Sequence, residues 1–515
     1  MSSLSQRRFA SFLVKTMQAS KRDIVKGLSA IKAKAKKCFR AGDTQITIDL
    51  VDAYFSIAGQ FNFNYVDNEI EALLKRISES VILQSNNYEP NREKWILYDD
   101  FCTTYVLGLQ WLDALAATGK RILYITSRDI YSESRHKNIL DRVSAYSNVE
   151  TLIIPQGGSI ERAQSLYDGI VRFGASKIIL HKYATASVMD LVLPILPTGM
   201  EKYVINLSDQ TFWFGARFID YCLEFRKFGA SVSMQCRGLT KEQLLMVPFY
   251  PADDQNPFTG FPAECTRDKV VIFSGGDYYK TLDEERTYWR LVKELLDRYP
   301  QVVFLFATKN IPEGDSEIKH FIADNHFEGR FIYIQFRPDI YQVFAHCDIY
   351  MGTCPTSGSL MSQLAAVNSK PILQFYKPGT SDDETEQALC INEKFLISYN
   401  NEEAFFNEAD KLIHDAEYRS IKGRRLQSAM MHREQFNRLV LMTLSSNKTQ
   451  FPIEEYDINY RELDNRWYYL EKAGYIHTIP YLYSLLGAKD CLRYAPAIFF
   501  KKNLTRVLSH YSSSL

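Results

Sequence analysis

The stretch DIYMGTCPTSGSLMSQLAAVNSKPILQF, Asp348–Phe375, decides the fold of the C-terminal half. Its pattern predicts a short strand, a turn rich in Pro, Ser and Gly, a helix of small residues and a second buried strand. The turn places Ser357, Gly358 and Ser359 where the helix begins, so backbone N–H groups and the positive end of the helix dipole converge there. Gly358 lets a ligand approach the backbone closely. The stretch therefore predicts a site for a phosphorylated ligand.

Apolar runs alternate with helical patterns on both sides of a segment rich in Pro, Gly and Asp. The expected strands lie at 95–98, 121–126, 150–155, 177–181, 202–207, 269–274, 302–307 and 330–335, and two of the expected helices lie at 287–299 and 340–346. This alternation predicts an α/β protein with two doubly wound, Rossmann-like domains. Ligands of such sheets bind at the carboxyl ends of the strands, and we expect them in a cleft between the two halves.

The two ends of the chain differ in composition from its centre. Residues 1–40 hold eleven Lys and Arg against one acid, Asp23, and their apolar residues recur at helical spacing. They predict a basic amphipathic helix on an anionic membrane surface, with a solvated helix or arm as the alternative. A helical pattern continues over 45–88. Residues 446–515, rich in Tyr, Trp and Lys, predict helices that pack on the body, with contact at a membrane interface as the alternative.

These changes of pattern define five expected regions. They are a helical basic N-terminal region at 1–90, a Rossmann-like domain at 91–250, a linker at 251–266, a second Rossmann-like domain at 267–445 and a helical C-terminal extension at 446–515.

Composition limits the classes of function. The chain has 515 residues, 46% of them hydrophobic and 24% charged, and a formal net charge of +0, which is ordinary for a soluble globular protein. Because no overall charge attracts nucleic acid, we expect no nucleic-acid partner. The nine cysteines form no C-x-x-C pair, residues 1–40 lack an apolar signal segment, and no apolar run approaches the ~20 residues that span a bilayer. We therefore expect a cytoplasmic protein without a metal site, with contact at the inner face of the cell membrane as an option for the basic arm.

A double glycine follows the first expected strand of the C-terminal half, in SGGDYYK (274–280). Gly275 and Gly276 permit a tight turn near a ligand, and Lys280 can reach a diphosphate; an ordinary turn is the alternative. Neither this turn nor the one in the opening stretch matches G-x-x-x-x-G-K-[ST] or G-x-G-x-x-G. The pattern therefore argues against an ATPase and against a standard dinucleotide dehydrogenase.

The order of these features resembles a known group of enzymes. Two Rossmann-like halves, a linker and the series DIYMGTCP, SG, QLAA and KPIL resemble glycosyltransferases of the GT-B fold over roughly residues 94–445. The resemblance is closest to the branch of bacterial cell-surface glycan and O-GlcNAc-type transferases, and its most specific part is 337–375. It implies transfer of a sugar from a nucleoside-diphosphate sugar, a UDP- or GDP-sugar, which binds the C-terminal half.

The resemblance also assigns donor-binding residues. The family usually binds the ribose through a Glu or Asp, whereas Gln363 stands at that position here and gives up a charge-assisted hydrogen bond. Arg337 stands where the family often places base- or phosphate-contacting residues; a surface Arg near a helix start is the alternative. The complete predicted donor site is Gly275, Gly276, Lys280, Arg337, Thr353, Ser357, Gly358, Ser359 and Gln363.

An inverting enzyme also needs a general base, which we expect at the carboxyl end of a strand in the N-terminal half. Asp209 is the first candidate, because NLSDQTFWFGARFIDY resembles a motif of some bacterial transferases, although Gln210 replaces the family's usual His. His181 ends the run KIILH, and Asp100 follows Asp99 at the end of WILYDD. The alternatives are a helix cap for Asp209 and for Asp100, and a structural role for His181.

The resemblance implies a glycosyltransferase of cell-surface polysaccharide biosynthesis that acts on a glycolipid, a surface glycan or a protein. No D-x-D motif occurs, so we expect a metal-independent enzyme. Phe212 and Trp213 are expected either to stack on a sugar or to plug the domain interface. Two rival functions remain: a nucleotide-sugar 2-epimerase of the same architecture, and a catalytically degenerate partner subunit, which Gln363 and Gln210 suggest.

Overall fold

The chain divides into two structural units, which we describe separately. In the computed structural model, unit 1 comprises Met1–Leu223, Val232–Leu244 and Trp467–Leu515, and unit 2 comprises Glu224–Ser231 and Leu245–Arg466. The structure describes residues 20–61, 63–100, 105–127, 133–182, 188–251, 256–266, 268–308, 312–335, 337–376, 386–387, 389, 396–455, 457–461 and 475–500. The first nineteen residues of the predicted basic arm and the last fifteen of the C-terminal extension lie outside the described residues.

Unit 1 is built on a 7-stranded sheet with the strand order β3-β2-β1-β4-β5-β6-β7. Its strands are β1 Asn91–Asp99, β2 Arg121–Ser127, β3 Val149–Ile154, β4 Ala175–His181, β5 Glu201–Ile205, β6 Tyr221–Glu224 and β7 Leu244–Met246. The pairs from β3 to β6 are parallel, which requires crossover connections. The order reverses between β1 and β4, so the carboxyl ends of these two strands form the switch point where open α/β sheets bind ligands.

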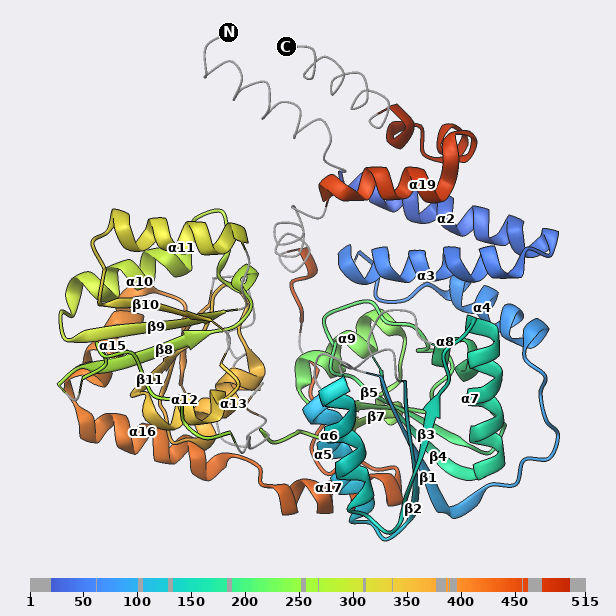
Figure 1. The fold of residues 1–515 in the computed structure, drawn as a ribbon, viewed down its shortest axis with the longest axis horizontal. Helices are drawn as coiled ribbons and strands as arrows, with labels where there is room; N and C mark the ends of the chain where they lie inside the picture. Colours follow the sequence, from blue (N-terminus) through green and yellow to red (C-terminus); the bar gives the residue numbers. More distant parts are fainter. Residues whose placement is uncertain are drawn as a thin grey trace. The chain divides into compact units, whose positions relative to one another are not determined.

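Helices cover both faces of this sheet. They are α5 Tyr105–Ala116, α6 Glu133–Ser144, α7 Ser159–Phe173, α8 Val188–Val192 and α9 Lys227–Arg237. Helices α5 and α6 lie on one side of the sheet and α7 and α8 on the other (Figure 1). Because both faces are covered, the central strands are apolar along most of their length, as the five buried residues at the end of β1 illustrate.

Unit 2 contains a 6-stranded sheet with the order β10-β9-β8-β11-β12-β13, and every pair is parallel. Its strands are β8 Val270–Gly275, β9 Val302–Thr308, β10 Phe331–Gln335, β11 Ile349–Met351, β12 Ile372–Phe375 and β13 Ser398–Tyr399. Alternate residues of β8 belong to different hydrophobic cores: Ile272 shares a core with Leu291 and Phe405, and Phe273 shares a core with Phe344 and Ala365. The helices are α10 Thr287–Arg298, α11 Pro312–Asp324, α12 Ile340–His346, α13 Ser359–Val367, α15 Glu402–His414, α16 Ala416–Ala429 and α17 Arg433–Ser446.

The opening stretch has the structure that its pattern predicts. Strand β11, helix α13 and strand β12 follow one another as expected, and the switch point of the second sheet lies between β8 and β11. The two Rossmann-like sheets expected from the sequence are therefore confirmed. The described residues between β7 and β8 contain neither helix nor strand, as expected for the Pro/Gly/Asp-rich segment.

Helices from the two ends of the chain pack together in unit 1. They are α2 Lys21–Ala41, α3 Thr44–Phe61, α4 Asn68–Val81 and α19 Tyr475–Tyr494. Helix α19 lies beside α2 (Figure 1), and Lys34 Nζ donates to the carbonyl oxygens of Leu485 (2.6 Å) and Leu486 (3.1 Å). The helical pattern expected over 45–88 is two helices, with Asp67 as the N-cap of α4.

The apolar face of α2 is covered by protein. Ile24 and Ile31 are fully buried and Leu28 is 5% exposed. The described part of the predicted amphipathic arm therefore does not present this face to lipid. Lys32 and Lys34 are paired within the protein, whereas Lys37 and Arg40 are exposed. Among the described residues, no helix combines the length and the apolar character that crossing a bilayer requires.

Two helical glycines provide a stability test with opposite expected signs. A Cβ at Gly423 in α16 would lie 1.8 Å from the backbone oxygen of Ser369, whereas a Cβ at Gly59 in α3 would meet no atom within 4 Å. We expect Gly423→Ala to destabilise unit 2 by about 3 kcal/mol, because the backbone of residue 369 cannot rotate away. Gly59→Ala should stabilise unit 1 by roughly 0.5–1 kcal/mol. Urea unfolding of both variants measures the two effects, and equal shifts would contradict the packing of α16.

Candidate functional site

The donor-side turn of unit 2 connects β11 to α13 at the switch point of the sheet. Gly358 is the N-cap of α13 and no side chain caps the helix, so backbone N–H groups of its first turn remain available to a ligand. The hydroxyl oxygens of Thr356 and Ser359 are buried and have no hydrogen-bond partner among the described residues. Thr356 was not among the predicted site residues, although it stands one residue before Ser357. The turn therefore offers backbone donors to a phosphorylated group, and it contains two buried hydroxyls that no described residue uses.

The remainder of this turn is held by internal hydrogen bonds. Thr353 is fully buried and its Oγ1 donates to the carbonyl oxygen of Thr356 at 2.7 Å. Gln374 Nε2 donates to the carbonyl oxygen of Thr353 at 2.9 Å, and a Cβ at Gly352 would lie 1.7 Å from Gln374 Oε1. Thr353 thus shapes the turn from inside the protein.

The double glycine after β8 has a packing explanation. A Cβ at Gly275 would lie 2.8 Å from the carbonyl oxygen of Ala307 on β9. Gly276 has φ +144°, which side chains rarely adopt, and its N–H donates to the same carbonyl at 3.0 Å. Lys280 is half-buried nearby, and its carbonyl accepts a bond of 3.4 Å from the N–H of Thr356. This hydrogen bond joins the loop after β8 to the donor-side turn.

Two of the predicted donor residues are engaged within the protein. Arg337 donates from Nε and Nη2 to Asp339 (2.7 and 2.6 Å) and from Nη1 to the carbonyl oxygen of Gly260 (2.9 Å). These bonds anchor the segment before β8 to the start of α12, so we leave Arg337 out of the proposed donor site. Gln363 is 0% exposed on α13, so the structure does not display its amide as a ribose-binding group.

In unit 1, acidic and basic side chains converge at the switch point between β1 and β4. His181 Nδ1 donates to Oδ1 of Asp99 at 2.6 Å, and the hydroxyl of Tyr124 donates to Oδ2 of Asp99 at 2.6 Å. His181 and Asp99 are fully buried. The N–H of Asp100 donates to the carbonyl oxygen of His181 at 3.0 Å, which places two of the three candidate bases side by side.

Asp100 has the environment that suits a general base. It is 5% exposed and accepts a hydrogen bond of 2.7 Å from the hydroxyl of Tyr98. Burial raises the pKa of Asp100 to about 6, although the Tyr98 hydroxyl and the charge of Lys182 act in the opposite direction. A carboxylate with this pKa is ionised near neutral pH and is basic enough to accept a proton.

Asp209 lies in the turn after β5 and is fully buried. It caps no helix, because the next helix of the described chain is α9, which begins at Lys227. Arg237 of α9 donates from Nη2 to the carbonyl oxygens of Asp209 (2.8 Å) and Thr211 (2.7 Å). This clamp on the Asp209 turn was not predicted, because it joins residues that belong to separate elements of the sequence.

Phe212 and Trp213 are buried inside unit 1. Phe212 is 1% exposed and its ring contacts the rings of Tyr54 and Phe55 on α3. Trp213 is 4% exposed, and the guanidinium of Arg237 lies 5.1 Å from its ring centroid. Both rings therefore pack inside unit 1, and the two expected roles, stacking on a sugar and plugging the domain interface, stay predictions.

Glu71 of α4 is a buried carboxylate beside this turn. It is 0% exposed, its Oε1 accepts from the N–H of Gly215 at 3.0 Å, and its Oε2 has no hydrogen-bond partner among the described residues. Burial raises the pKa of Glu71 to about 7 from its ordinary value of 4.5. Glu71 thus joins the N-terminal helices to the turn that holds Asp209.

The raised pKa of Glu71 predicts a pH-dependent stability. The pKa of this carboxyl is near 4.5 in the unfolded chain and near 7 in the folded protein. Its contribution to the stability of the folded protein is therefore fully present below pH 4.5 and is lost as pH rises through 7. We expect the free energy of unfolding of Glu71→Gln to equal that of the wild type near pH 4 and to be about 3 kcal/mol larger at pH 8. Glu79→Gln, an exposed position on the same helix, is the control in urea unfolding at both pH values. If the free energies of unfolding of Glu71→Gln and the wild type differed by the same amount at both pH values, the raised pKa of a buried Glu71 carboxyl would be contradicted.

No group of three or more His, Cys, Asp or Glu with the geometry of a metal site occurs in the part of the chain that the structure describes.

Comparison with known proteins places the chain in a fold class. No protein-family model matches it. A search of curated proteins finds no match either. Solved structures do match, and with the two parallel sheets described above they show that the chain has the GT-B fold.

Two of these solved structures are glycosyltransferases. A variant of the O-GlcNAc transferase of Thermobaculum terrenum has a TM-score of 0.52 at 13% identity and covers 86% of this chain and 83% of its own. A glycosyltransferase of Rickettsia africae has a TM-score of 0.50 at 10% identity and covers 69% of this chain and 98% of its own. At such identities the similarity shows the fold alone.

Proposed function

We propose that the protein is a glycosyltransferase that moves a sugar from a UDP- or GDP-sugar to an acceptor hydroxyl. The observation that supports this best is the uncapped start of α13 at the switch point of the second sheet. There, no side chain caps the backbone N–H groups of the first turn, and the same turn holds the buried hydroxyls of Thr356 and Ser359, which have no partner among the described residues. This combination suits a diphosphate, because it supplies donors at a helix N-terminus without a metal ion.

The proposed reaction divides the work between the two units. Unit 2 binds the nucleoside diphosphate, and the N–H groups of α13 stabilise the charge that develops on the leaving diphosphate oxygen. The acceptor hydroxyl bound to unit 1 attacks the anomeric carbon, the bond from that carbon to the diphosphate oxygen breaks, and a carboxylate takes the hydroxyl proton. This single displacement inverts the configuration at the anomeric carbon.

We assign the base to Asp100 and retain Asp209 and His181 as the alternatives. Asp100 is at the carboxyl end of β1, has a pKa of about 6 and is the most exposed of the three, at 5%. In this proposal the pair Asp99–His181 positions the backbone of Asp100, since the carbonyl of His181 accepts the Asp100 N–H. The acceptor class is a glycolipid, a surface glycan or a protein, and the exposed cations of α2 favour an anionic membrane or acceptor nearby.

Two glycine caps allow a matched test of the donor site. Gly358 caps α13 and Gly158 caps α7, both without a side-chain hydrogen bond. A Cβ at Gly358 would meet only Met361 and Tyr350 at ordinary contact distances, the nearest being 3.5 Å, and a Cβ at Gly158 would meet nothing within 4 Å. Both Ala variants should therefore fold. We expect Gly358→Ala to weaken UDP or GDP binding about tenfold (~1.4 kcal/mol), because the methyl group hinders close approach of the diphosphate, and Gly158→Ala to have no effect.

Calorimetric titration with UDP and GDP, followed by turnover assays with UDP- and GDP-sugars, separates the rival functions. Nucleotide binding with transfer or slow donor hydrolysis supports the glycosyltransferase. Release of the C2 epimer of the donor sugar would support the epimerase instead. No binding of either nucleotide would overturn the proposed donor site and favour the degenerate partner subunit.

A further inference from the structure

A small pocket in unit 1 opens at the same sheet edge as Asp100. It is lined by Lys182 after β4, by Val204, Ile205 and Asn206 at the end of β5, and by Ser208 and Trp213 in the following turn. Its volume is about 10 Å³, which is room for one water-sized group and too little for a sugar ring or a phosphate.

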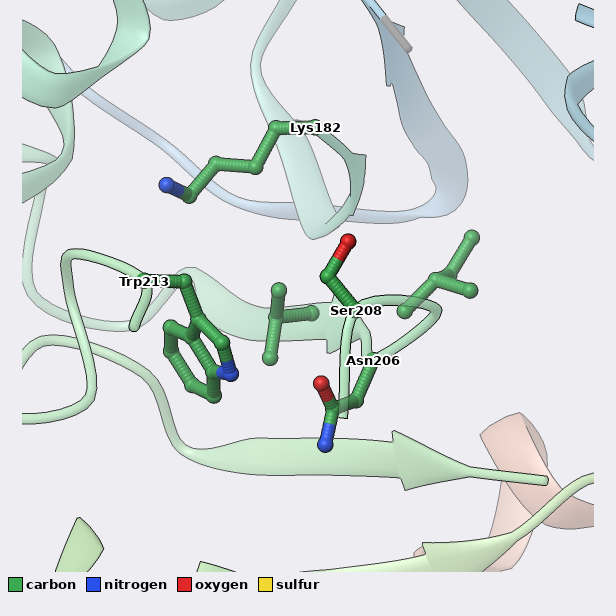
Figure 2. Close-up of a pocket in the computed structure, with 6 residues that line it drawn as sticks. Lys182, Asn206, Ser208 and Trp213 are labelled. Atoms are coloured by element: carbon green, nitrogen blue, oxygen red, sulfur yellow. The ribbon is translucent and has the colours of Figure 1, made fainter. Parts of the chain in front are cut away.

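The polar groups of the pocket suit a neutral hydroxyl. Trp213 Nε1 is buried and has no hydrogen-bond partner among the described residues, and an indole N–H can only donate. In Figure 2 this nitrogen faces the side of the pocket on which Asn206 and Ser208 lie. Asn206 Nδ2 donates to Ser233 Oγ at 3.4 Å. The Ser208 hydroxyl can donate and accept, so Trp213 and Ser208 together offer both kinds of partner that a hydroxyl needs.

The charge of the pocket argues against an anionic group. Lys182 Nζ donates to Oδ1 of Asp190 at 2.9 Å, and the side chains of both residues are less than 4% exposed. The lysine charge is therefore matched by a carboxylate. A phosphate or carboxylate entering the pocket would lose its hydration without meeting a net positive charge.

The pocket is also rigid. Arg237 joins the carbonyl oxygens of Asp209 and Thr211 and lies over the Trp213 ring, which fixes the direction of the indole N–H. A fixed donor costs little ordering entropy when a partner binds.

We propose that this pocket receives one hydroxyl group of a saccharide acceptor. The proposal rests on the proposed function, because it names the acceptor class of the same unit. The hydroxyl accepts from Trp213 Nε1 and exchanges a hydrogen bond with Ser208, while the rest of the sugar ring lies outside the pocket.

The test measures binding of methyl glycosides of glucose, galactose, mannose and N-acetylglucosamine, and of their monodeoxy analogues, by NMR titration of the full chain. Trp213→Phe removes the N–H and keeps an aromatic ring, and Ser208→Ala removes the hydroxyl from a half-buried position. Trp289→Phe is the matched control, because its Nε1 in unit 2 is likewise buried without a described partner. We expect Trp213→Phe and Ser208→Ala each to weaken one glycoside roughly five- to tenfold, and Trp289→Phe to leave it unchanged.

The deoxy analogues identify the contact. Removal of one particular hydroxyl from the glycoside should weaken its binding to the wild type by the same factor. Binding of that deoxy analogue to Trp213→Phe should be little weaker still, because both changes remove the same hydrogen bond. The proposal would be overturned if the losses of affinity from the deoxy change and from the variant were additive, or if no glycoside bound. It would also be overturned if the variants lowered only the unfolding midpoint, which would indicate that the pocket holds a structural water. UDP and GDP titrations of the same samples test the donor site separately. Absence of nucleotide binding would therefore count against the proposed function and can be distinguished from absence of glycoside binding to this pocket.

Discussion

Replacement of Asp100 by asparagine is expected to lower the rate of sugar transfer by roughly 10²–10⁴-fold while nucleotide binding stays intact. The carboxylate is the proposed proton acceptor, and its pKa of about 6 makes the active, ionised form predominate above that pH. The wild-type rate should therefore rise with pH up to about 6 and level off above it. In Asp100→Asn the rise of the rate with pH should disappear, because an amide does not titrate in this range. Initial rates from pH 5 to 8 with a UDP- or GDP-sugar measure both effects.

The design of this experiment separates chemistry from folding. Asparagine has the shape of Asp100 and can still accept the hydrogen bond from Tyr98. Asp168→Asn, an exposed carboxylate on α7 that accepts one bond from Gln164, is the matched control and should transfer at the wild-type rate. If Asp209→Asn abolishes transfer while Asp100→Asn retains it and its rise with pH, the base is Asp209 and our assignment is wrong.

Removal of the Asp339 carboxylate is expected to destabilise unit 2 by about 3–5 kcal/mol. Asp339 is fully buried, accepts two bonds from Arg337 and accepts two more from the N–H (2.8 Å) and hydroxyl (3.0 Å) of Thr259. Asp339→Ala leaves the guanidinium of Arg337, whose side chain is only 14% exposed, without its carboxylate. It also releases the segment around Thr259 from the start of α12. Urea unfolding at pH 7 measures the loss.

The same pair has a predicted pH dependence. Hydrogen bonds from Arg337 hold the pKa of Asp339 well below its usual value of 3.8. Its stabilisation is therefore complete above pH 3.8 and is lost as pH falls through the folded pKa, so Asp339→Ala should show a weaker acid destabilisation than wild type. Asp268→Ala, an exposed carboxylate bonded to Thr266, should change stability by less than ~0.5 kcal/mol. If Asp339→Ala and Asp268→Ala lost similar amounts of stability, the buried pair would stabilise unit 2 no more than an exposed carboxylate does.

Two predicted site residues have surroundings that the sequence did not indicate. Arg337 matches the family position for a nucleotide contact, yet Asp339 lies two residues later and the carbonyl of Gly260 comes from a segment far upstream. The bidentate bond therefore uses the guanidinium inside the protein. Gln363 follows the expected helical register of α13, but its side chain is buried. Register along a helix does not reveal what covers each face.

Other functional groups left no signal that sequence reasoning could use. Glu71 is one of several acids on an amphipathic helix, and only its place against Gly215 distinguishes it from exposed Glu79. Arg237 likewise becomes important only because α9 folds back on the Asp209 turn. Thr356 is the exception, since its position directly before Ser357 made it available to the same argument.

The sequence alone determined the two parallel sheets, the turn at Gly358 and the strand ends that hold Asp100 and His181. Strands buried on both faces are continuous apolar runs, and a turn before a helix has a local signature, so short segments are enough to predict them. Only the tertiary structure decided which charged groups meet. Asp99 and His181 are 82 residues apart and pair because β1 and β4 are neighbours at the switch point. The energy of such pairs depends on distance and burial in space, which local sequence patterns do not encode.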